Sequence, residues 1–80
     1  MTDTELLKDY IKESGYKQSF IAHQLGLTSY GFALKRDNKS EFLPSEIEAL
    51  CELLKIDTLE ERFNIFFANK VEFNATQKSG

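Results

Sequence analysis

Cysteine and histidine are the side chains best suited to catalysis or metal binding, and the chain has one of each, Cys51 and His23. A lone cysteine excludes an intramolecular disulfide and a cysteine zinc site, and it fits the reducing cytoplasm in which we expect the protein to reside. His23 has no partner at metal-ligand spacing. No Ser/His/Asp, Cys/His or paired-carboxylate arrangement occurs at a usable spacing either. The sequence therefore predicts no enzyme, no metal, no cofactor and no small-molecule substrate.

Lysine and arginine offer a different chemistry, because cations attract the phosphates of nucleic acids. The chain of 80 residues has a net charge of −3, but this charge is unevenly distributed. Residues 16–40 carry four cations and one carboxylate, whereas residues 41–72 carry eight carboxylates and three cations. The basic segment is a candidate nucleic-acid contact, and the alternative is an ordinary solvated face.

Helical periodicity and helix-ending residue types predict three helices in the first half of the chain. The expected helices cover residues 3–14, 17–25 and 30–36. Their expected ends are the Thr2–Glu5 capping box, Gly15, Gly26, a cap at Thr28 or Ser29, and Asp37-Asn38. The second and third helices are therefore joined by a very short turn.

Two more helices are expected in the acidic half. Pro44 suits the first turn of one helix, and its apolar face consists of Ile47, Leu50, Cys51 and Leu54. The other helix begins at a Thr58–Glu61 capping box and runs to about Ala68, with an apolar face of Leu59, Phe63, Phe66 and Phe67. Residues 71–73 alternate as in a short strand or extended arm, and residues 74–80 are expected to form a frayed, disordered tail. The prediction is one all-α domain over residues 1–73, with no run of the roughly 20 apolar residues that a membrane span needs.

The spacing of small and apolar residues around the turn at Gly26 is informative. In a DNA-binding helix-turn-helix, a small residue lets the two helices cross closely, glycine makes the turn, and apolar residues follow into the core. Ala22, Gly26, Leu27 and Phe32 occupy these places. The alternative is a simple helical hairpin without a DNA-binding role.

The stretch Gln18–Tyr30 (QSFIAHQLGLTSY) resembles the lambda-repressor/Cro-like helix-turn-helix family of phage and bacterial transcriptional regulators. The resemblance covers about residues 4–68 and is strongest to short prophage-type proteins. It implies a compact five-helix fold, with the helix-turn-helix at helices 2 and 3, and a double-stranded DNA operator as partner. Two positions depart from the family pattern: Asn38 replaces a common glycine, and Arg36 replaces a common apolar residue.

The resemblance also implies roles for residues around the third helix, whose start would enter the major groove. The base-edge candidates are Ser29, Tyr30, Ala33 and Leu34. The phosphate candidates are Lys17, Gln18, Thr28, Lys35, Asn38, Lys39 and Ser40. Each has a plainer alternative, in which Tyr30 covers the edge of the core and the polar residues are ordinary solvated side chains.

Surplus apolar residues near the C-terminus suggest a contact with another chain, because Ile65 lies off the expected apolar face. The candidates for a dimer or partner contact are Ile65, Phe66, Val71 and Phe73. A homodimer is one interpretation, since two helix-turn-helix units read two half-sites. The alternative function is an antirepressor or co-regulator that binds a partner regulator protein through the acidic surface of the last two helices.

Overall fold

Five α-helices make up residues 1–67, the part of the chain that the computed structural model describes. They are α1 (Thr4–Ser14), α2 (Gln18–Gln24), α3 (Ser29–Arg36), α4 (Pro44–Leu54) and α5 (Leu59–Phe66). The prediction of an all-helical fold with five helices is confirmed, and residues 1–67 contain no strand. The arm expected at residues 71–73 and the tail expected at residues 74–80 lie outside the described residues.

Polar caps begin α3 and α5 as the sequence predicted. The Thr28 hydroxyl accepts a hydrogen bond from the Gly31 N–H at 2.9 Å, and the Thr58 hydroxyl accepts one from the Glu61 N–H at 3.1 Å. Each bond satisfies a backbone donor that has no partner within the helix.

The cap of α1 is Asp3, and the expected capping box at Thr2 is wrong. The Asp3 carboxylate accepts a hydrogen bond from the Leu6 N–H at 3.1 Å. The Thr2 backbone is held elsewhere, because its N–H donates to Asn38 Oδ1 at 2.9 Å and its carbonyl accepts from Asn38 Nδ2 at 2.8 Å. A contact between residues distant in the chain thus moves the start of the helix by one position.

Residues in the left-handed conformation follow the ends of several helices. Gly26 has a φ of 77°, as its position after α2 predicted, and Gly15, which ends α1 as expected, has a φ of 78°. Asn38 follows α3 with a φ of 66°. Lys55 has a φ of 59° at the end of α4, which the sequence did not predict and which strains an L-residue.

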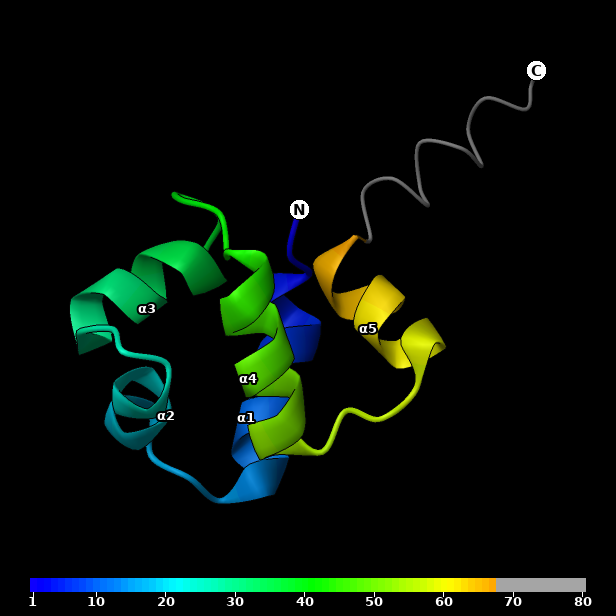
Figure 1. Ribbon diagram of the computed structural model, residues 1–80, viewed down its shortest axis with the longest axis horizontal. Coiled ribbons are helices and arrows are strands. Elements are labelled where there is room, and N and C mark those ends of the chain that lie inside the picture. Colours follow the sequence, from blue (N-terminus) through cyan, green and yellow to red (C-terminus); the bar gives the residue numbers. More distant parts are fainter. Residues whose placement is uncertain (68–80) are drawn as a thin grey trace.

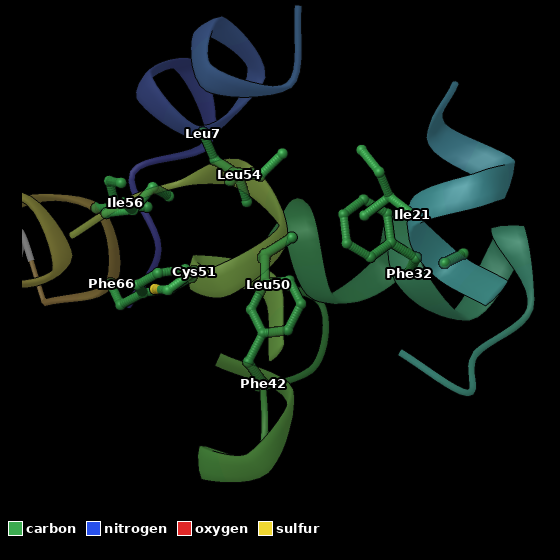
Figure 2. Packing of buried hydrophobic residues seen from close by; sticks show 11 residues of the cluster. Leu7, Ile21, Phe32, Phe42, Leu50, Cys51, Leu54, Ile56 and Phe66 are labelled. Atoms are coloured by element: carbon green, nitrogen blue, oxygen red, sulfur yellow. The ribbon is translucent and has the colours of Figure 1, made fainter. Parts of the chain in front are cut away.

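The helices lie in three groups around one core. Helices α1 and α4 form the centre, α2 and α3 pack together on one side, and α5 lies on the other side (Figure 1). Each helix contributes to the core, which includes Leu7, Ile21, Phe32, Leu50 and Ile65, all with no exposed surface (Figure 2 labels most of the cluster).

Phe42 connects the two sides of the core, although it lies in the loop between α3 and α4. Its ring meets Phe32 of α3 and Phe66 of α5 edge to face, with ring centroids 5.8 Å apart in both pairs. Edge-to-face pairs are favourable beyond the area they bury. The loop is therefore part of the core and fixes the distance between α3 and α5.

Helix α5 buries only Phe66 of the predicted apolar face, together with Ile65, which was expected to lie off that face. Ile65 is 0% exposed and Phe66 is also buried, so neither is available for the predicted dimer or partner contact. The N-terminal segment covers this side of the helix, where the Asp3 N–H donates to the Ile65 carbonyl at 2.6 Å. Leu59 and Phe63 face solvent instead, with 82% and 44% of their surfaces exposed. The other two predicted contact residues, Val71 and Phe73, lie outside the described residues.

The strained backbone at Lys55 leads to a prediction about stability. Lys55→Gly should raise the free energy of unfolding by about 1 kcal/mol, because glycine adopts positive φ without steric cost. The same substitution at the exposed Lys8, in the middle of α1, should lower the free energy of unfolding by about 1 kcal/mol. Urea titrations of both variants and the parent would measure this, and shifts of the same sign would contradict the prediction.

Candidate nucleic-acid interface

Helices α2 and α3 are held together by a short turn over residues 25–28. Gly26 turns the chain with its positive φ, and the Leu27 N–H donates to the Ala22 carbonyl at 2.9 Å. Ala22 is 1% exposed and Phe32 is fully buried, while Leu27 packs against the core. The inner side of the pair is thus apolar and closely packed, which leaves its outer side for polar contacts.

The four residues predicted to contact bases lie on the first two turns of α3, with different degrees of exposure. Ser29 is exposed, and Tyr30 has 73% of its surface in solvent. Ala33 and Leu34 are half-buried. Tyr30 therefore projects from the helix into solvent. It does not cover the edge of the core, as the plainer interpretation of this residue had it.

The seven residues predicted to contact phosphate fall into two sets. All of the first set are exposed: Lys17 lies before α2, Thr28 in the turn between the two helices, and Lys39 and Ser40 after α3. Asn38 is also exposed, but its amide is bound to the Thr2 backbone. Gln18 and Lys35 are half-buried and bound to side chains of other residues.

Lys35 pairs with Glu46 across the α3–α4 loop. Lys35 Nζ and Glu46 Oε1 are 2.5 Å apart, and the two side chains are only 15% and 10% exposed. The same Glu46 oxygen accepts a hydrogen bond from the Leu43 N–H at 2.9 Å, which caps the start of α4. Lys35 therefore joins α3 to α4 and is not free to bind phosphate.

The Glu46 carboxylate is stabilised in its charged form. Burial alone would raise its pKa, but the hydrogen bonds from the Leu43 N–H and the Lys35 ammonium outweigh burial and lower the pKa below its ordinary value. The charged carboxylate is therefore the form that the fold stabilises.

Arg36 is the second cation of α3 that the fold engages. Its Nε and an Nη atom each donate to the Asp37 carboxylate at 2.8 Å, and its other Nη atom donates to Gln18 Oε1. The hydrogen bonds from Arg36 lower the pKa of Asp37, against the opposing effect of burial. Arg36 thus links the end of α3 to the start of α2, and of the four cations in residues 16–40 only Lys17 and Lys39 have exposed side chains.

Sequence reasoning missed the partners of Lys35, Arg36 and Asn38. The Thr4 hydroxyl adds another contact at this point, since it donates to the Arg36 carbonyl at 2.7 Å. Apart from the bonds between the neighbours Arg36 and Asp37, these contacts join residues that are distant in the chain, so no local sequence pattern predicts them. One further local signal is Glu46 at the third position of α4, where a carboxylate often binds the N–H of the capping residue.

Cys51 and His23, the two side chains best suited to catalysis or metal binding, lie on different helices. Cys51 is fully buried in α4, and burial raises the pKa of its thiol. His23 is exposed on α2. Within residues 1–67, no three His, Cys, Asp or Glu residues are grouped closely enough to hold a metal ion. No helix in that part of the chain is both long and apolar enough to cross a membrane.

No known family model, curated protein or solved structure matches this chain.

The Lys35–Glu46 pair leads to a prediction about pH. Glu46→Gln should lower the free energy of unfolding by about 2 kcal/mol at pH 7, since a charged hydrogen bond is replaced by a neutral one. Because the folded-state pKa of Glu46 is lowered, the difference in free energy of unfolding between parent and variant is complete above the unfolded pKa of about 4.3. It disappears as the pH falls through the lower folded-state value.

Urea titrations of parent and variant at several pH values between neutral and strongly acid would measure this difference. Glu48→Gln is the matched control, because the Glu48 carboxylate is 62% exposed and lies 3.3 Å from Arg62. Exposed pairs contribute at most about 1 kcal/mol, so the control should show a small change. A parent–variant difference for Glu46→Gln that stayed constant with pH would refute the assignment.

Proposed function

We propose that the protein binds double-stranded DNA in a sequence-specific manner and regulates transcription, with α3 entering the major groove. The observation that supports this most strongly is the division of α3 into two faces. Phe32 is fully buried against the core, while Ser29 and Tyr30 at the start of the helix are exposed. The resemblance of Gln18–Tyr30 to the lambda-repressor/Cro-like helix-turn-helix supports the same function.

The dimensions and chemistry of α3 suit this role. Its 8 residues form a helix about 12 Å long, and the major groove, at about 12 Å, is wide enough to admit an α-helix of about 10–12 Å diameter. The Tyr30 and Ser29 hydroxyls can donate to or accept from base edges. Ala33 and Leu34 can contact the methyl group of thymine. The proposed readout is therefore partly polar and partly apolar, without an arginine to guanine contact.

The electrostatic contribution to binding is small in this proposal. Lys17 and Lys39 are exposed at the two ends of the α2–α3 unit, whereas Lys35 and Arg36 are paired with carboxylates. Each lysine that neutralises a phosphate contributes about −0.9 to the slope of log K against log salt, so two lysines give a slope of about −2. Specific contacts from α3 must then supply much of the affinity. Such a protein would repress a promoter by occupying it.

Removing Lys39 tests the phosphate contacts. Lys39→Ala should weaken binding to all duplexes and make the slope less negative by about 0.9, because one fewer counterion is released. Lys55→Asn is the matched control, since it also removes one positive charge but lies at the opposite end of α4 from the α3–α4 loop (Figure 1). Fluorescence anisotropy with labelled duplex at several salt concentrations gives both slopes. Equal slopes for the two variants would count against the proposed face.

Removing Tyr30 tests base recognition. Tyr30→Ala should select different sequences from a pool of random duplexes, and its affinity for the sites selected by the parent should fall about tenfold or more. Leu59→Ala on α5 is the control, because Leu59 is also a large exposed side chain. Selection followed by sequencing compares the three proteins. If Tyr30→Ala selects the same sites as the parent, α3 does not read DNA through this residue.

A further inference from the structure

An apolar groove lies between α4 and α5, away from the proposed DNA-binding face. It has a volume of about 480 Å³ and is lined by Ile47, Leu59, Glu60, Arg62, Phe63 and Phe67. Leu59 and Phe63 are four residues apart on α5, with 82% and 44% of their surfaces exposed. So much apolar surface in one place commonly marks a binding site.

The walls of the groove are held in place by contacts within the chain. The Phe63 ring lies against the Phe67 ring, with centroids 5.8 Å apart. The Arg62 guanidinium donates to the Ile56 carbonyl at 3.1 Å and to Glu48 Oε1 at 3.3 Å, which fixes its side chain beside the groove. A site formed in advance loses less conformational entropy when it binds.

The carboxylates beside the groove outnumber its one cation. Glu60 lines the groove together with Arg62, and Glu48 pairs with Arg62, whereas Glu46 is bound to Lys35 and does not belong to this rim. The Glu48 carboxylate is 62% exposed. Glu41 lines a smaller hollow that shares Ile47 and Phe67 with the groove. A partner that complements this surface has an apolar ridge with positive charge beside it.

We propose that the α4–α5 groove binds an amphipathic helix of another protein, with its apolar face in the groove and basic residues on its flanks. Leu59, Phe63 and Phe67 recur every fourth residue and span about 12 Å, which matches two turns of a partner helix. A second copy of this chain fits less well. A symmetric pair would place groove against groove and bring Glu48 and Glu60 of both copies together.

A synthetic peptide tests the proposal by fluorescence anisotropy. The probe is a fluorescein-labelled helix with leucines at helical spacing on one face and lysines at both ends, and a matched peptide has glutamates at the ends. The parent should bind the lysine peptide at least about tenfold more tightly than the glutamate peptide. Glu60→Lys should reduce this preference.

Variants of the groove test its location. Phe63→Ser and the more exposed Leu59→Ser should each weaken binding of the lysine peptide about tenfold. Phe20→Ser is the control, because Phe20 is a similarly exposed aromatic residue on α2, and it should leave peptide binding unchanged. Binding of DNA by Phe63→Ser should equal that of the parent, which separates this proposal from the proposed function.

Four results would overturn the proposal. The first is equal affinity for the two peptides, and the second is unchanged binding in both groove variants. The third is a dimer in sedimentation that Phe63→Ser dissociates, because a second copy would then occupy the groove. The fourth is peptide binding that appears only after Val71 and Phe73 are both changed to Ser in the full chain, because the chain's own C-terminal segment would then occupy the groove.

Discussion

The burial of Phe42 between Phe32 and Phe66 is the interaction on which the arrangement of this small fold depends. A chain of this size buries only about 60% of its unfolded surface, so a loop residue must help to complete the core. The two edge-to-face contacts fix α3 on one side and α5 on the other, relative to the central α1 and α4. The outer face of α3 and the groove beside α5 therefore lie on two sides of a core that this aromatic ring helps to hold together.

Local signals predicted the helices well, whereas contacts between distant residues decided the details. Gly26 and Thr58 act within a few residues of their positions, so their roles can be read from the sequence. The buried face of α5 could not be predicted from the sequence, because apolar residues occur on two sides of this short helix. The N-terminal segment decides which side is buried when the Asp3 N–H bonds to the Ile65 carbonyl.

In the candidate site, too, local signals predicted some features, and contacts between distant residues decided others. The exposure of Tyr30 follows from the helical period once Phe32, two residues later, faces the core, whereas Ser29 is exposed as the first residue of the helix. The ion pair that engages Lys35 does not follow from the helical period, because its partner Glu46 belongs to another helix. The sequence gives the charges but not the distances between them. The basic segment therefore looked more strongly positive than the folded surface is.

The buried thiol of Cys51 has a further consequence. Its sulfur has no exposed surface and its raised pKa keeps it protonated at neutral pH, so the reactive thiolate forms only when the core around α4 opens. The chain has no tryptophan to report on such opening events. The rate at which a thiol reagent modifies Cys51 therefore reports how often the folded protein opens transiently, and the measurement needs no added label.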